Sequence, residues 1–141
     1  MKKTFIWPLA IFIVLAAATF FFIKQANNTP TNLPTYSPSY DWRLSFEFSP
    51  EEIIETDFSS SVPLSLFQIT QDIAHREAWD FDYQDYGTMG ILVNQIKDKE
   101  SGQEQKYWQY FVGDIQPQIS ADQYFPDNET HITWKFQTSD Y

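Results

Sequence analysis

The chain has 141 residues, a formal net charge of −10 at pH 7 and no cysteine. This length predicts one small folded domain, and the lack of cysteine excludes a disulfide framework, a thiolate nucleophile and a zinc-thiolate site. The basic residues beyond Lys24 are scattered singly. Because a phosphate-binding surface needs clustered Lys and Arg, we expect no nucleic-acid partner.

Residues 1–24 predict an N-terminal membrane anchor. Lys2 and Lys3 precede an uncharged, mostly apolar run over residues 4–23. A run of about 20 residues is long enough to span a hydrocarbon core of roughly 30 Å, and the Lys pair favours a cytoplasmic N-terminus. A cleaved signal peptide is the competing interpretation, since residues 16–18 offer an A-x-A cleavage pattern. Cleavage there would expose the apolar terminus Thr-Phe-Phe-Phe-Ile, so we favour a single-pass protein of the cell membrane.

Residues 25–40 predict a linker. Pro30, Pro34 and Pro38 stand among residues that are mostly small or polar, so the segment cannot bury enough apolar surface to order itself. We expect it to hold a domain of residues 41–141 off the membrane, on the extracellular or periplasmic side.

The first half of that domain predicts two strands and a helix. Residues 42–48 alternate apolar and polar side chains, which is the period of a half-buried strand. Residues 53–58 predict a second strand that pairs back as a hairpin, although residues 49–52 also suit a helix start. From Ser65 to about Arg76 apolar residues recur at helical spacing, and Ser65 and Gln68 have the spacing of a capping box.

The second half predicts three more strands. Residues 89–96 are apolar on both faces, as in the middle of a sheet, whereas the charged residues 97–106 predict a turn or loop. Residues 107–112 and 130–136 predict the last two strands, the latter with Ile132, Trp134 and Phe136 inward and His131, Thr133 and Lys135 outward. This order predicts an α+β fold, a small antiparallel-rich β-grasp-like domain with one main helix; a β-sandwich is the alternative.

Three segments of the chain resemble the transcobalamin-like C-terminal domain family. They are YGTMGILVNQI at 86–96, KYWQYFVGD at 106–114 and ADQYFPDNETHITWKF at 121–136, and the resemblance spans roughly residues 46–136. Where the family has an Asp-Gly-Asp turn before its last strand, this chain has Asn128-Glu129-Thr130. The loss of glycine at Glu129 predicts an altered turn, since a residue with a Cβ resists positive φ.

The resemblance implies a bacterial, membrane-anchored member with a ligand-binding fold. In the animal cobalamin carriers this domain lies opposite a helical domain, with a corrinoid between the two. A cobalamin-like ligand is therefore implied for this chain by the resemblance alone, and fold transfers more safely than ligand.

Known catalytic motifs are absent from the sequence. No G-x-S-x-G or H-E-x-x-H occurs, and for His75 and His131 a solvated imidazole is favoured over catalysis. We therefore expect neither an enzyme nor a cofactor. With 19 acidic residues, a close carboxylate pair of the kind that hydrolyses glycosides is conceivable but would arise by chance.

Asp80, Asp82 and Asp85 form a weak calcium candidate, because oxygen ligands at short spacing suit this ion. Their spacing fails the EF-hand pattern, which needs glycine at the position of Asp85 and glutamate at that of Ile91. A solvated acidic face beside core aromatic residues is therefore favoured over a metal site.

Aromatic residues supply the candidate ligand site. Along residues 107–112, alternation puts Tyr107, Gln109 and Phe111 on one face and Trp108, Tyr110 and Val112 on the other. A single hydrophobic core needs only one of these faces. The second aromatic face must therefore contact the helix, another internal layer or an outside partner, and we favour an internal layer. The candidate ligand-binding residues are Trp108, Tyr110, Tyr107, Tyr86 and Trp79.

Two functions follow from these observations. The first is a non-catalytic binding module that captures a small ligand such as a corrinoid. The alternative is a structural or protein-interaction domain of a cell-surface assembly, with an exposed strand edge and acidic face as its docking surface.

Overall fold

The structure, a computed structural model, describes residues 39–139, which form an α+β domain of strands and one α-helix. The predicted anchor and nearly all of the predicted linker lie outside the described residues. Within residues 39–139, no helix combines the length and the apolar character needed to cross a membrane.

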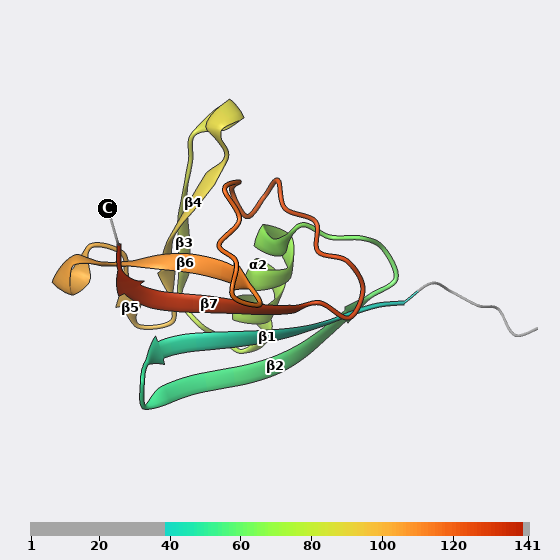
Figure 1. Cartoon of the computed structure of the whole chain (residues 1–141), viewed down its shortest axis with the longest axis horizontal. Helices are drawn as coiled ribbons and strands as arrows, with labels where there is room; N and C mark the ends of the chain where they lie inside the picture. The colour runs from blue at the N-terminus through green and yellow to red at the C-terminus, as the bar shows by residue number, and fades with distance from the viewer. Residues whose placement is uncertain (1–38, 140–141) are drawn as a thin grey trace, which may run out of the picture. The chain divides into compact units, whose positions relative to one another are not determined.

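The elements follow one another in a simple order (Figure 1). A hairpin of two long strands is followed by the helix, a second hairpin with a short third strand, and two final strands joined by a long loop. Their bounds are β1 Tyr40–Ser49, β2 Glu52–Ser60, α2 Leu66–Arg76, β3 Phe81–Asp85, η1 Gly87–Met89, β4 Ile91–Ile96, β5 Lys99–Glu100, η2 Gln103–Gln105, β6 Lys106–Val112 and β7 His131–Thr138.

The strands form two separate sheets. The larger has the order β2-β1-β7-β6 and the smaller the order β3-β4-β5. Within the larger sheet β1 runs parallel to β7, while the β1–β2 and β6–β7 pairs are antiparallel. The β3–β4 hairpin stands crosswise to the larger sheet (Figure 1), so the two sheets open away from each other.

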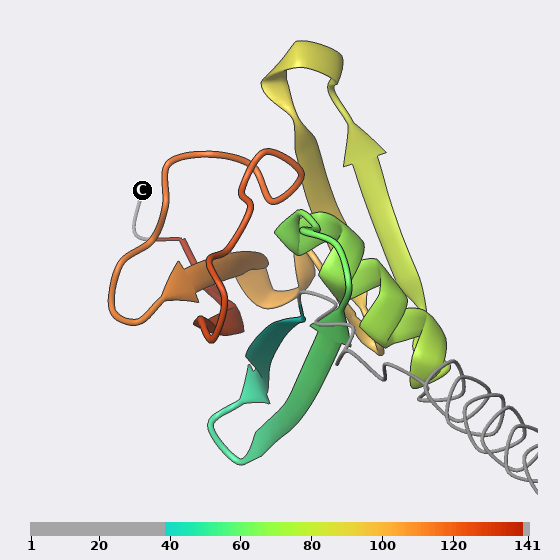
Figure 2. The ribbon, with the colours of Figure 1, turned by 90° about the vertical axis from the view of Figure 1, so that its right-hand side faces the viewer.

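The helix α2 packs against both sheets (Figure 2). The indole Nε1 of Trp134 on β7 donates to Thr70 Oγ1 of the helix at 2.9 Å. From the same buried face of the helix, the Phe67 ring lies 5.8 Å from the Phe81 ring and 4.8 Å from the Tyr83 ring of β3, centroid to centroid. One continuous apolar core therefore joins the helix to both sheets.

Most predicted elements are confirmed. The first hairpin forms, with Phe46 directly opposite Ile54, and the helix begins at the predicted capping box of Ser65 and Gln68. Ile132, Trp134 and Phe136 are buried as expected. The α+β class is therefore confirmed over an all-β sandwich.

Three details differ from the sequence prediction. The strand expected from residue 89 starts at Ile91, because η1 and a glycine of φ +93° precede it. The predicted loop over 97–106 contains the short strand β5. The strand β3 was not predicted, although Phe81 and Tyr83 alternate there with polar residues; the segment was interpreted as an acidic face beside core aromatic residues, and Tyr83 is 40% exposed.

The turn before β7 keeps a left-handed residue without glycine. Glu129 has φ +62°, and its N–H donates to the Asp41 carbonyl at 2.7 Å. The backbone bond to the start of β1 thus holds a conformation that a Cβ disfavours.

Gly90 lets the tip of the β3–β4 hairpin touch the loop between β6 and β7. A Cβ added to Gly90 would lie 1.9 Å from Ser120 Oγ and 2.9 Å from Asp122 Oδ1. Real Cβ atoms do not approach so closely, so this contact requires glycine for space as well as for its positive φ.

We expect Gly90→Ala to lower the free energy of unfolding by clearly more than Gly87→Ala. Gly87 also has positive φ (+64°), but an added Cβ there would meet nothing within 4 Å. Gly87→Ala therefore measures only the cost of placing a residue with a Cβ at positive φ, which is about 1 kcal/mol. Urea unfolding of both variants measures the difference. Equal losses would mean that the hairpin and the loop do not depend on this close contact.

Candidate ligand-binding groove

A groove of about 920 Å³ lies where β4 diverges from the edge strand β6, with part of the long loop between β6 and β7 as its third side. Its floor includes Trp108, Tyr110 and Trp134, which are only 4%, 7% and 2% exposed. Tyr107 and Tyr86 also line it and are 43% and 51% exposed, so they stand at its rim.

Ser101 joins the two strands beside the groove, because it bonds to both of them. Its N–H donates to the Asn94 carbonyl at 2.7 Å, and its hydroxyl accepts from the Trp108 N–H at 3.3 Å and lies 3.4 Å from the Val93 carbonyl. Just beyond this corner, the Trp108 indole Nε1 donates to the Lys99 carbonyl at 2.9 Å. The floor residue Trp108 is therefore held by its indole N–H on the Lys99 carbonyl and by its main-chain N–H on the Ser101 hydroxyl.

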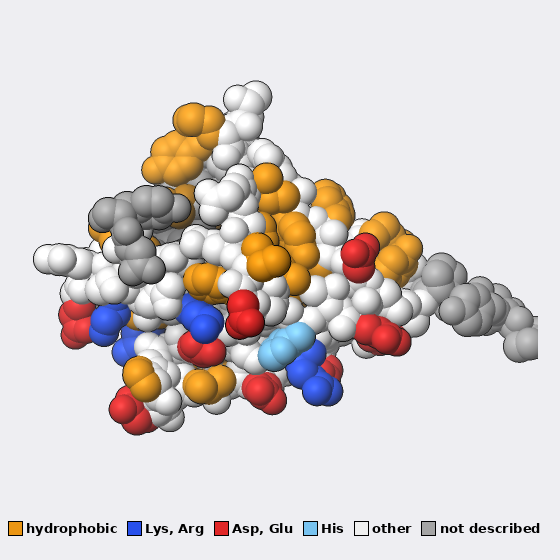
Figure 3. Space-filling model, viewed as in Figure 1, with side chains coloured by type: hydrophobic (Ala, Val, Ile, Leu, Met, Phe, Trp, Pro, Cys, Tyr) orange, Lys and Arg blue, Asp and Glu red, His pale blue; other side chains and the backbone are white. Residues whose placement is uncertain are grey.

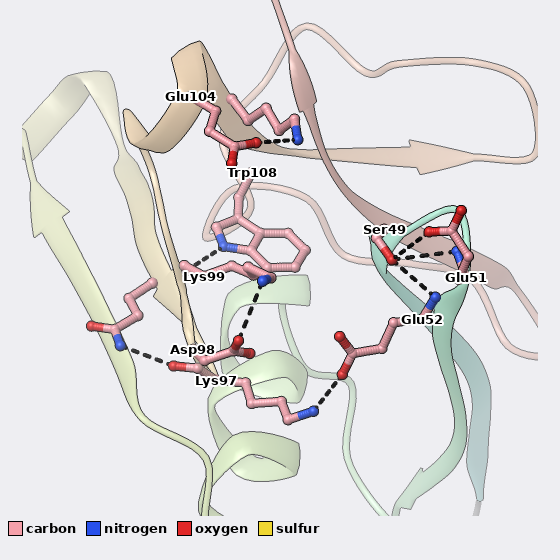
Figure 4. A network of polar contacts seen from close by, with 10 residues as sticks. Ser49, Glu51, Glu52, Lys97, Asp98, Lys99, Glu104 and Trp108 are labelled. Carbon is pink, nitrogen blue, oxygen red and sulfur yellow. Dashed lines mark hydrogen bonds and ion pairs between the residues drawn. The ribbon is translucent and has the colours of Figure 1, made fainter.

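A polar network supports the same corner from outside (Figure 4). Lys97 forms an ion pair with Glu52 at 2.6 Å, and its Nζ lies 5.0 Å from the centre of the Phe48 ring. The side-chain hydrogen bond to Glu52 raises the pKa of Lys97. This contact ties the turn after β4 to the first hairpin, although so exposed a pair adds only about 0–1 kcal/mol.

The long loop closes one end of the groove. The Tyr110 hydroxyl donates to the Ile119 carbonyl at 2.8 Å, and burial raises the pKa of Tyr110 to about 12. The Ile91 N–H donates to Asp122 Oδ1 at 2.9 Å, and the Ser120 hydroxyl donates to the same oxygen. The loop is thus attached to both β6 and β4.

Backbone groups of β6 face the groove. On β6 the N–H groups of Trp108 and Val112 bond away from β7, to Ser101 Oγ and to the Ile115 carbonyl. Because backbone direction alternates along a strand, the N–H and C=O of Tyr110 must also point away from β7. Within residues 39–139 no strand pairs with this edge of β6. The groove therefore offers both a donor and an acceptor beside its aromatic floor.

Four of the five predicted ligand-binding residues come together in this groove: Tyr86, Tyr107, Trp108 and Tyr110. Trp79 does not. Its ring packs edge-on against Phe46 and Phe48, with centroids 5.2 and 5.8 Å apart. Trp79 is therefore a half-buried residue that packs against the core, and it does not line the groove.

The second aromatic face of β6 has no full internal cover. Trp108 and Tyr110 form the buried face, whereas Tyr107 on the opposite face is 43% exposed. On that face Lys135 Nζ lies 5.3 Å from the centre of the Phe111 ring. The favoured expectation of a second internal layer is therefore wrong for this face.

The acidic calcium candidate does not converge. Asp85 Oδ1 accepts from the Gly87 N–H at 2.7 Å, and Asp82 lies 3.4 Å from the Asn94 amide. In the described part of the chain, no three His, Asp or Glu side chains gather as metal ligands. Asp80, Asp82 and Asp85 instead lie along an exposed stretch of chain that leads into and along β3.

The sequence analysis missed the contributions of the long loop and the hairpin tip. Met89, Leu92 and Ile119 line the groove and are 77%, 43% and 46% exposed. Exposed apolar side chains also gather over the hairpin tip and the long loop in the space-filling view, away from the charged side chains over β1 and β2 (Figure 3). Irregular segments have no hydrophobic period, so no sequence pattern could have grouped these residues.

Asp122 makes the attachment of the loop to β4 dependent on pH. Burial opposes its ionisation, but the hydrogen bonds from Ser120 and from the Ile91 N–H outweigh burial and hold the pKa of Asp122 below its ordinary value of 3.8. A carboxyl whose pKa is lowered by folding stabilises the fold above its unfolded pKa. This stabilisation is lost as the pH falls through the folded pKa.

We expect Asp122→Asn to lower the free energy of unfolding at neutral pH by about 1–2 kcal/mol, because a charge-assisted bond is replaced by a neutral one. The difference from the unsubstituted protein should shrink as the pH falls below about 4. Urea unfolding at a series of pH values measures it. A difference independent of pH would show that the charge of Asp122 contributes nothing.

Comparisons with known proteins agree with this architecture. No curated protein matches the chain. Among solved structures, a protein from Ruminococcus gnavus described as a candidate metal binding protein superposes with a TM-score of 0.57 at 14% identity, covering 71% of this chain and 98% of that protein. Haptocorrin in complex with Cbi superposes with a TM-score of 0.59 at 12% identity, covering 72% of this chain.

These likenesses establish the fold alone. The chain covers 26% of the length of haptocorrin. The two superpositions confirm the transcobalamin-like fold that was expected from the sequence. The model of one family, described as Domain of unknown function (DUF4430), matches residues 64–138, which run from the start of α2 through β7. The chain therefore belongs to the DUF4430 family.

Proposed function

We propose that this protein is a membrane-anchored, extracytoplasmic and non-catalytic binding module that captures a small flat ligand, such as a corrinoid, in the groove between β4 and β6. The observation that carries the proposal is the convergence of Tyr86, Tyr107, Trp108 and Tyr110 on one cavity of about 920 Å³. Ligand pockets have roughly this size and combine apolar lining with a few fixed polar groups.

The lining suits a corrinoid in two respects. The exposed rings of Tyr86 and Tyr107 at the rim offer flat surfaces that stack on a planar macrocycle, beside a mostly apolar floor. The backbone N–H and C=O of Tyr110, which face the groove, suit the amide groups at the edge of such a ring. The superposition with haptocorrin, at 12% identity, supports a shared fold; the ligand class is proposed from the groove itself.

A protein-interaction role is the second candidate. Tyr86, Met89 and Leu92 on the hairpin are 51%, 77% and 43% exposed, and Ile115 and Phe125 on the long loop are 71% and 58% exposed. Exposed apolar side chains in such number are a common feature of protein docking surfaces.

A thermal-shift measurement on the full chain in detergent tests ligand capture. A ligand that binds only the folded state raises the melting temperature, and we expect this rise with corrinoids. Tyr107→Ala should weaken binding several-fold to about tenfold, because it removes about 1 kcal/mol of stacking from an exposed rim position.

Phe125→Ala is the matched control, since Phe125 is 58% exposed but does not line the groove. Trp108→Ala is unsuitable, because Trp108 is also part of the hydrophobic core. Absence of any shift with corrinoids, haems and sugars, together with co-purification of a surface protein, would favour the interaction role.

The topology has a separate test. We expect the mature protein to retain residues 1–24 and to fractionate with the membrane, because residues 4–23 are long and apolar enough to span it. Mass spectrometry of the mature N-terminus measures this directly. A mature chain that starts at Thr19 would replace the anchor by a cleaved signal peptide.

A further inference from the structure

The lining of the groove contains no charged side chain. Its 17 residues are apolar, aromatic or neutral polar, and the neutral polar side chains other than tyrosine are Gln109, Gln116, Ser120 and Ser139. A ligand that carries a charge into this groove would therefore meet no ion of opposite sign from the lining.

Basic residues elsewhere on the domain are already engaged. Each Lys and Arg among residues 39–139 lies within ion-pair distance of a carboxylate, and the pairs are Arg43–Asp57, Arg76–Glu77, Lys97–Glu52, Lys99–Asp98, Lys106–Glu104 and Lys135–Glu47. The whole chain has 19 acidic against 9 basic residues. The described surface consequently presents an excess of unpaired negative charge.

Carboxylates also stand close to the groove itself. Asp122 binds the N–H of the groove residue Ile91 at 2.9 Å. The hydrogen bonds that lower the pKa of Asp122 keep it ionised at neutral pH. Asp85 is the residue opposite Ile91 in the β3–β4 pair. The charged residues beside the β4 wall are therefore negative, whereas on the β6 side Lys135 lies opposite the lining residue Gln109 and is paired with Glu47.

We propose that the groove selects neutral ligands whose flat apolar body carries amide-type groups, and that it rejects the same body carrying carboxylates. This inference rests on the proposed function and adds the ligand class to it. An amide exchanges its bonds to water for bonds to the Tyr110 backbone edge. A carboxylate loses hydration in the groove without gaining a cation, and it is repelled by the surrounding negative charge.

Matched pairs of ligands test the selection. One pair is a corrinoid with intact amide side chains and the same corrinoid with those amides hydrolysed to carboxylates; the other is naphthamide and naphthoate. With the full chain in detergent at neutral pH, we expect the carboxylate of each pair to bind at least about tenfold more weakly. Added salt should bring the affinities of the amide and the carboxylate closer together, because it screens the repulsion between the carboxylate and the acidic domain. Calorimetry and ligand-observed NMR measure these affinities.

Two substitutions separate the effect of the groove lining on ligand selection from the effect of the net charge of the domain. Gln116→Lys adds a cation to the lining and should raise affinity for the carboxylates about tenfold while leaving the amides nearly unchanged. Gln71→Lys adds the same charge on an exposed position of α2 outside the groove, and we expect it to change the ratio far less.

The outcomes are distinguishable. Equal binding of amide and carboxylate within a pair would overturn the selection while leaving ligand capture intact. Selection between the naphthalene ligands with no corrinoid binding would support the inference and overturn the corrinoid. If neither pair binds, ligand capture itself is wrong and the inference fails with it. Equal effects of Gln116→Lys and Gln71→Lys would assign the selection to net charge rather than to the groove.

Discussion

The groove depends on one constraint: the two sheets share no strand and are joined at Ser101, by its backbone N–H on one side and its hydroxyl on the other. That residue bonds to Asn94 and lies beside Val93 on β4, and it accepts from the Trp108 N–H on β6. Since β4 and β6 meet at this corner and then diverge, the edge of β6 cannot be paired along its length by β4. The open edge and the buried indole beside it are consequences of the same junction.

The long loop between β6 and β7 turns this open angle into a groove. It is attached to β6 through the Tyr110 hydroxyl and to β4 through Asp122, and Gly90 allows the close contact at Ser120. Loops placed by a rigid scaffold often carry binding functions. Here the loop also supplies Ile119 to the lining, so the shape of the groove and the attachment of the loop cannot vary independently.

The distribution of charge gives the groove its chemical character. Paired cations and ionised carboxylates lie outside the lining, while the lining itself is neutral. Burial of a charge without a partner costs far more than burial of a hydrogen-bonded amide. Ligand selection by charge therefore follows from what surrounds the groove as much as from what lines it.

Local patterns in the sequence determined the elements that have a regular period. The alternation in residues 42–48 and 130–136, the capping box at Ser65 and the aromatic run at 106–112 each predicted the element that forms. Four aromatic residues that the sequence analysis named also line the groove; only Tyr107 lies on the face of β6 left over from the core, while Trp108 and Tyr110 lie on the buried face. Only the tertiary structure decided that Trp79 packs into the core, that β1 pairs in parallel with β7, and that an unpatterned loop completes the groove. Those outcomes depend on contacts between segments that are far apart in the chain. The hydrophobic periodicity of one segment carries no information about such contacts.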